Sequence, residues 1–136
     1  GSGSFYAGLA TQLVQQVKDQ PDRLAGGRTR VGRYLAEENV LRLLNLRRVA
    51  RSVEGAAPGP EGNVTKLKLS DHMIEGGAIT TALAGPETAL HDGAGALAGR
   101  LVMSARAMAI AGGTSEVTRN QIAERILGMP RDPLIN

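Results

Sequence analysis

Residues 110–131, with the sequence IAGGTSEVTRNQIAERILGMPR, combine a turn, a helix start and a charged first helical turn. Gly112 and Gly113 can adopt backbone angles that other residues avoid, and Thr114 or Ser115 can cap the helix that follows. The first N–H groups of a helix have no partner within it, and with the helix dipole they attract anions such as phosphate. The segment therefore predicts an anion-binding helix start. The alternative is an ordinary amphipathic helix with a well-capped N-terminus.

Outward from this segment, hydrophobic residues recur at helical spacing, and proline or glycine ends each run. Gly85 and Pro86 interrupt the pattern, and the stretch PETALHDGAG from residue 86 to 95 is expected to be a polar, flexible loop. Four helices with short connections form an antiparallel bundle, across which a fifth helix can pack. The predicted helices cover residues 5–19, 29–54, 61–83, 95–110 and 114–127.

The expected core is aliphatic, because the chain contains one Phe, two Tyr and no Trp. Leu, Ile, Val, Met and Ala pack well between helices, so the predicted fold class is all-α. Gly76 and Gly77 are expected to allow close helix packing. The predicted buried faces consist of Val31, Leu35, Leu41, Leu44, Val49 and Val53 in the second helix, and of Val64, Leu67, Met73, Ile74, Ala78 and Ile79 in the third.

Length and composition exclude several classes of protein. A chain of 136 residues is expected to form one domain, here residues 5–136, after a flexible lead or tag at residues 1–4. The absence of Cys excludes disulfides, thiolate metal sites and a cysteine nucleophile, and fits a reducing cytoplasm. No apolar run reaches the roughly 18 to 20 residues of a membrane span. The net charge of +3 comes from scattered arginines, which argues against nucleic-acid binding.

The other motifs in the sequence give little evidence for a nucleotide-binding, catalytic or metal site. The glycines of GAGALAGR at residues 93–100 do not have the spacing of a dinucleotide-binding loop, and no strand precedes them. A phosphate-binding P-loop and a nucleophile elbow are both absent from the sequence. Asp71 and His72 are neighbours on a helix and point in different directions, so they predict no acid–base pair. No metal site is expected.

The motif GTSE at residues 113–116, followed by RNxIAERILGxPR, resembles the closing helix of the acyl-CoA dehydrogenase family. These FAD enzymes desaturate acyl-CoA thioesters between the α and β carbons. The resemblance covers residues 5–131 and implies that Thr114 binds the FAD pyrophosphate region, that Glu116 reaches the adenosine ribose, and that Gly113 and Ser115 belong to the same site. Gly85 lies in a diverged form of the family's glycine turn, which contacts the adenine end of the flavin across a subunit interface.

The resemblance also implies an acyl-CoA substrate, a homo- or hetero-oligomer and an electron-accepting flavoprotein. The cytoplasmic location is expected from the composition and from the lack of a secretory signal pattern in the given sequence. Many family members place a catalytic Glu directly before the Gly-Thr pair, where this chain has Gly112. Either the base comes from an earlier segment or the polypeptide is the non-catalytic partner in a heteromeric enzyme. A helical binding module without enzymatic activity is the third reading.

The family's enzymes carry a helical domain and a β-barrel before this bundle. We therefore expect the chain to be an isolated C-terminal domain that neither retains FAD tightly nor turns over substrate.

Overall fold

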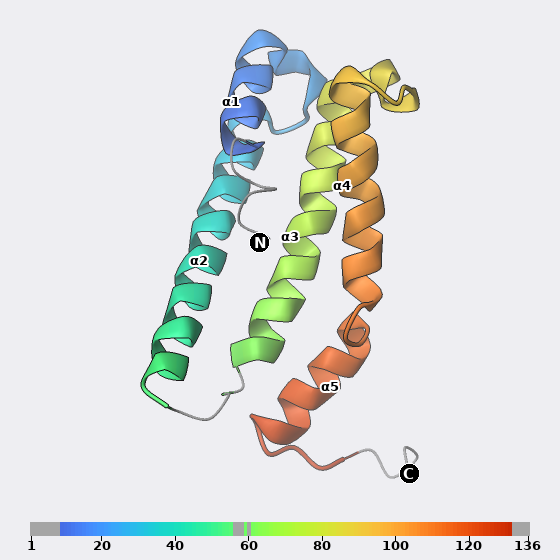
Figure 1. Cartoon of the computed structure of the whole chain (residues 1–136). Helices are drawn as coiled ribbons and strands as arrows, with labels where there is room; N and C mark the ends of the chain where they lie inside the picture. The colour runs from blue at the N-terminus through green and yellow to red at the C-terminus, as the bar shows by residue number, and fades with distance from the viewer. Residues whose placement is uncertain (1–8, 56–58, 60, 132–136) are drawn as a thin grey trace.

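The computed structural model describes residues 9–55, 59 and 61–131, which form helices and turns without a strand (Figure 1). The predicted all-α fold is confirmed. The start of the first predicted helix, at residues 5–8, and the expected lead at residues 1–4 lie outside the described residues. The described elements are α1 (Leu9–Asp19), η1 (Pro21–Arg23), α2 (Gly27–Val53), α3 (Glu61–Ala84), η2 (Gly85–Ala89), α4 (Gly93–Ile110) and α5 (Ser115–Arg125), where η denotes a 3-10 helix.

Helices α1 to α4 run alternately up and down, and α2, α3 and α4 lie side by side (Figure 1). The α1 helix has 11 residues and covers only the first half of α2, which has 27. The α5 helix continues from the lower end of α4 after a bend of 41° and packs against α3. The arrangement is the antiparallel bundle with an additional C-terminal helix that the sequence predicts.

The core lies where α1 covers the other three helices. Glycines bring the backbones close there, as expected: a Cβ at Gly77 would lie 3.3 Å from Val102 on α4. A Cβ at Gly76 would lie 2.6 Å from the Tyr34 hydroxyl of α2. The buried cluster consists of Leu13, Val17, Leu24, Val31, Tyr34, Ile79, Leu83 and Leu101.

Apart from the start of the first helix, which lies outside the described residues, the predicted helix boundaries are within two residues of the observed ones. The prediction of a loop after Gly85 is wrong. Residues 85–89 form the helical turn η2, with Pro86 in its first turn, and α4 begins at Gly93 instead of residue 95. Pro supplies a backbone angle suited to a first helical turn. Gly95 therefore lies inside α4, where it packs against the backbone of η2.

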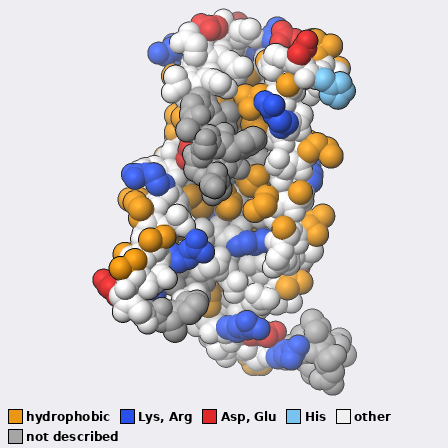
Figure 2. Space-filling view, viewed as in Figure 1, with side chains coloured by type: hydrophobic (Ala, Val, Ile, Leu, Met, Phe, Trp, Pro, Cys, Tyr) orange, Lys and Arg blue, Asp and Glu red, His pale blue; other side chains and the backbone are white. Residues whose placement is uncertain are grey.

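The predicted buried faces are only partly correct. Val31 is buried, whereas Val49 and Val53 are 48% and 82% exposed. On α3, Val64 and Ala78 are exposed. The second half of α2 extends past α1, so α1 does not cover it. We call its exposed apolar side chains the α2 stripe, and hydrophobic side chains are visible over this part of α2 in Figure 2. The α2 stripe consists of Val40, Leu43, Leu46, Val49 and Val53.

Taken singly, none of the helices in the described part of the chain has the length and apolarity to cross a membrane. Only the bent pair of α4 and α5 meets both criteria together.

Candidate functional site

The turn between α4 and α5 is built around two glycines. Gly112 has φ +72° and Gly113 has φ +111°, in the region that side chains other than glycine rarely occupy. The Gly113 N–H donates to the Ile110 carbonyl at 3.1 Å, which closes the turn directly after α4. This geometry redirects the chain within four residues and exposes the start of α5.

Thr114 is the N-cap of α5, which resolves the choice between Thr114 and Ser115. Its backbone is extended, its Oγ1 accepts from the Val117 N–H at 3.4 Å, and its carbonyl accepts from the Thr118 N–H at 2.9 Å. Thr114 is exposed, and Ser115 is half-buried as the first residue of α5. The N–H groups of Ser115 and Glu116 come too early in the helix to have a backbone partner within it. The predicted helix start therefore exists and is open to solvent.

Glu116 lies fully exposed on this helix start. Hydrogen bonds from its own backbone N–H and from the Thr114 hydroxyl hold the pKa of its carboxyl below the usual value, and the charges of Arg119 and Lys66 lower it further. The carboxylate is thus ionised at neutral pH and interacts with the positive end of the helix dipole. A ligand anion that binds these amides must displace it, which an exposed side chain can accommodate by changing rotamer.

Lys66 reaches the same turn from α3. Its Nζ donates to the Ala109 carbonyl at 3.2 Å and to the Gly113 carbonyl, on the two sides of Gly112. The sequence analysis missed this residue, because more than 40 residues separate Lys66 from the turn and no local pattern connects them.

Gly85 lies at the other end of α4. It has φ +57° and begins η2, and the Nη1 of Arg23 lies 3.6 Å from the position of a Cβ there. The same Nη1 donates to the Leu83 carbonyl at 3.1 Å. The 18 residues of α4 separate Gly85 from Thr114 by about 27 Å along the helix axis. One chain therefore does not bring Gly85 and the α4–α5 turn into one site.

At Gly112, the position of the family's Glu, a Cβ would meet no atom within 4 Å. Packing therefore leaves room for a side chain. The positive φ disfavours one, because an L-residue with a Cβ in this conformation is strained by roughly 1–2 kcal/mol. The backbone of the turn suits the glycine that is present.

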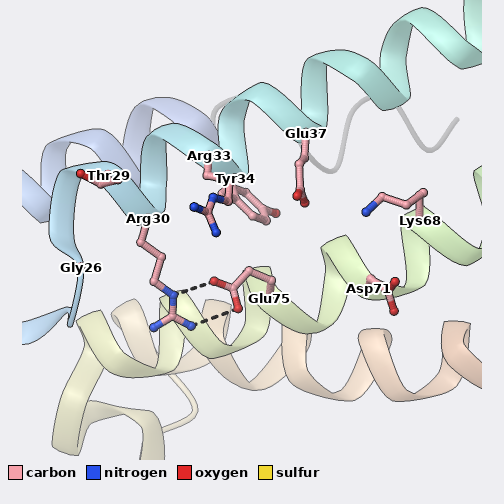
Figure 3. A pocket seen from close by; sticks show the side chains of 9 residues that line it. All are labelled: Gly26, Thr29, Arg30, Arg33, Tyr34, Glu37, Lys68, Asp71 and Glu75. Carbon is pink, nitrogen blue, oxygen red and sulfur yellow. Dashed lines mark hydrogen bonds and ion pairs between the residues drawn. The ribbon is translucent and has the colours of Figure 1, made fainter.

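Apart from this turn, a hollow of about 540 Å³ lies between α2 and α3 (Figure 3). The guanidinium of Arg30 donates to both carboxylate oxygens of Glu75, at 2.6 and 3.0 Å, and thereby lowers the pKa of Glu75. Three basic and three acidic side chains line the hollow, so it has no net charge to attract a diphosphate. The lining residues are Gly26, Thr29, Arg30, Arg33, Tyr34, Glu37, Lys68, Asp71 and Glu75.

Behind this hollow, the His72 ring stacks on Tyr34 with centroids 4.0 Å apart. His72 is buried and Asp71 exposed, in agreement with the expectation that they form no pair. The nearest carboxylate oxygen, of Glu37, lies 4.0 Å from Nδ1. Burial lowers the pKa of His72, so the ring packs as a neutral group. No three metal-ligating side chains among the described residues are placed to hold an ion.

The protein-family model described as "Acyl-CoA dehydrogenase, C-terminal domain" matches residues 8–127. No curated protein and no solved structure matches the chain significantly. The matched residues include all five described α-helices, the turn at Gly85 and the complete α4–α5 turn. The chain therefore belongs to the acyl-CoA dehydrogenase family, as its C-terminal helical domain.

Proposed function

We propose that this domain belongs to an FAD-dependent acyl-CoA dehydrogenase that introduces a double bond between the α and β carbons of an acyl-CoA thioester. Family membership supports the activity. The observation that carries the proposal is the exposed start of α5, where a threonine cap and backbone N–H groups without a helical backbone partner follow a glycine turn.

The residues of this turn fit part of FAD. The Thr114 hydroxyl and the N–H groups of Ser115 and Glu116 are donors suited to a diphosphate, and Gly113 lets the ligand approach the backbone. The Glu116 carboxylate is a poor neighbour for phosphate but a good acceptor for ribose hydroxyls. FAD, when bound, supplies the acceptor for the hydride that leaves the β carbon. The turn binds and orients the cofactor and performs no proton transfer.

Removal of the α proton needs a base within hydrogen-bond reach of the substrate. Gly112 cannot take a proton, so the carboxylate comes from outside this turn. This observation also favours a second candidate function, a non-catalytic subunit of a heteromeric acyl-CoA dehydrogenase that retains the bundle for assembly.

Further partners follow from the proposal. The α2 stripe is a suitable interface for other parts of a homo- or hetero-oligomer, because a row of exposed Val and Leu side chains gains free energy on burial. An acyl-CoA substrate, an electron-accepting flavoprotein and a cytoplasmic location complete the proposed function.

The cofactor site is tested with Thr114→Val in the longest natural form of the protein that contains this chain. The variant keeps the shape of the side chain but removes the hydroxyl, so we expect flavin to bind about fivefold to tenfold more weakly, which is roughly 1 kcal/mol. Thr11→Val, on the exposed face of α1, is the matched control and should bind like the wild type. Flavin affinity unchanged by Thr114→Val argues against the site. A natural full-length protein that binds no flavin argues against the enzyme and leaves the non-catalytic subunit and the helical binding module.

The two enzyme readings are separated with Gly112→Glu and Gly112→Gln, measured with and without the natural partner subunit. Both variants impose the same backbone strain, and only Glu supplies a base. Activity gained by Glu over Gln indicates that this turn adjoins the reacting carbons. Equal activities indicate a base elsewhere, and loss of all activity without the partner supports the heteromeric subunit.

A further inference from the structure

We propose that Lys66 is a positioning residue for the cofactor-binding turn: its ammonium group holds the α4–α5 connection so that the N–H groups at the start of α5 face outward. The inference rests on the proposed diphosphate site and adds to it a residue from another helix. It rests on three observations: the hydrogen bonds of Lys66, its positive charge, and the open space around Gly112.

The Lys66 ammonium bridges the two ends of the turn. The Ala109 carbonyl lies in the last turn of α4 and has lost its helical partner, because the Gly113 N–H donates to Ile110 instead. Lys66 Nζ donates a hydrogen bond to this carbonyl at 3.2 Å. It donates another to the carbonyl of Gly113, the residue directly before Thr114. An ammonium group has three donor hydrogens, so it can serve both acceptors at once.

Within the turn, one backbone hydrogen bond, from the Gly113 N–H to the Ile110 carbonyl, restricts the conformation of the two glycines. Gly112 and Gly113 are the least restricted residue type, and nothing lies within 4 Å of a Cβ at Gly112. On the far side, Thr118 anchors α5, since it is buried and its hydroxyl donates to the Thr114 carbonyl at 2.9 Å. Lys66 supplies the corresponding restraint on the near side. Without it, the glycine pair is free to change the direction in which the first amides of α5 point.

The charge of Lys66 acts on the same place. It contributes to the lowered pKa of Glu116, so its field reaches the ligand-facing end of α5. A half-buried cation behind a helix N-terminus adds to the positive potential there, and less water surrounds it than an exposed lysine. Lys66 therefore favours a bound diphosphate both by orienting the donors and by adding positive charge.

The experiment compares Lys66→Met, Lys66→Arg and the control Lys68→Met in this chain. Lys68 lies two residues further along α3, is exposed, and lines the hollow between α2 and α3. Its loss therefore removes the same charge without touching the turn. Two quantities are measured by NMR: the amide chemical shifts of residues 112–116, and their titration with inorganic pyrophosphate. The circular dichroism spectrum verifies that each variant is folded.

In Lys66→Met, we expect the amide chemical shifts of residues 112–116 to change by more than those of the α2 amides do in the same variant. Pyrophosphate should bind about fivefold more weakly. Lys66→Arg should restore part of both, and Lys68→Met should match the wild type. Turn amides that stay at wild-type positions in Lys66→Met overturn the positioning role, even if pyrophosphate still binds. A wild type that does not bind pyrophosphate at these amides overturns the diphosphate site itself.

One measurement needs no variant, and it applies if Lys66→Met fails to fold. The side-chain ammonium signals of the wild-type protein are recorded with nitrogen-15 labelled lysine. Lys66 should show slowly exchanging hydrogens because two carbonyls hold them, whereas those of Lys68 exchange rapidly. Rapid exchange at Lys66 equal to that at Lys68 contradicts the proposal.

Discussion

At the scale of single residues, the α4–α5 turn depends both on neighbours in the chain and on one distant residue, Lys66. The cap at Thr114 and the glycine pair were predictable, because capping and positive φ depend on residues adjacent in the chain. Lys66 was not, since its bonds to Ala109 and Gly113 exist only after α3 and α4 pack together.

Glu116 provides a pH test of the helix start. Its pKa is lowered below the usual value of 4.5 by hydrogen bonds from its own N–H and from Thr114. A pKa lowered by folding means that the ionised carboxylate stabilises the fold above pH 4.5, and that this stabilisation is lost as the pH falls through the folded-state pKa. We expect an NMR titration to give a Glu116 pKa below 4.5 in the wild type, and a higher one in Thr114→Val.

The contribution to stability is measured in Glu116→Gln. The thermal unfolding midpoint of this variant should change less with pH in the acid range than the midpoint of the wild type does. A Glu116 pKa at its usual value, unaffected by Thr114→Val, contradicts the hydrogen bonds assigned to the carboxylate.

At the scale of elements, the helix boundaries within the described residues were predictable to within two residues. Hydrophobic spacing marks the helices, and Pro21, Gly55 and Gly128 follow their ends. The short helix η2 was missed, since its polar sequence reads as a loop. Its conformation depends on α4, whose first turn packs directly on it.

Alanine substitutions at Gly95 and Gly99 of α4 test the packing of α4 against η2. A Cβ at Gly95 would lie 1.9 Å from the Glu87 carbonyl oxygen and 2.6 Å from that of Leu90, both backbone atoms of the η2 region. We expect Gly95→Ala to lower the free energy of unfolding by about 3 kcal/mol, the upper part of the range for overpacking. Gly99 has nothing within 4 Å of a Cβ, so Gly99→Ala should raise stability by roughly 0.5–1 kcal/mol.

Urea denaturation measures both variants. Equal stabilities of Gly95→Ala and the wild type would show that η2 moves away from α4 without cost. A destabilised Gly99→Ala would show that its side of α4 is covered.

At the scale of the whole molecule, the buried faces were predicted as though every helix had a neighbour along its full length. Val49 and Val53 are exposed because α1 stops halfway along α2. Periodicity shows which face of a helix is apolar. It does not show whether this chain or another covers that face.

The α2 stripe should make this chain self-associate. Replacement of Leu43 and Leu46, each about half exposed, by Lys places two charges in the centre of the stripe. We expect the double variant to remain folded and to dissociate at concentrations roughly tenfold above those of the wild type, as measured by sedimentation velocity. Leu90→Lys, which is equally exposed but off the stripe, is the control. Unchanged sedimentation of the double variant contradicts an interface here.

The separation of Gly85 from Thr114 has a genetic consequence. If each flavin contacts Thr114 of one subunit and Gly85 of its neighbour, two defective alleles can complement each other. In a mixed pair with Thr114→Val on one chain and a Gly85 variant on the other, one flavin receives both defects and the other receives none. Random pairing of equal amounts should thus restore about one quarter of the sites, although neither allele alone retains any intact site.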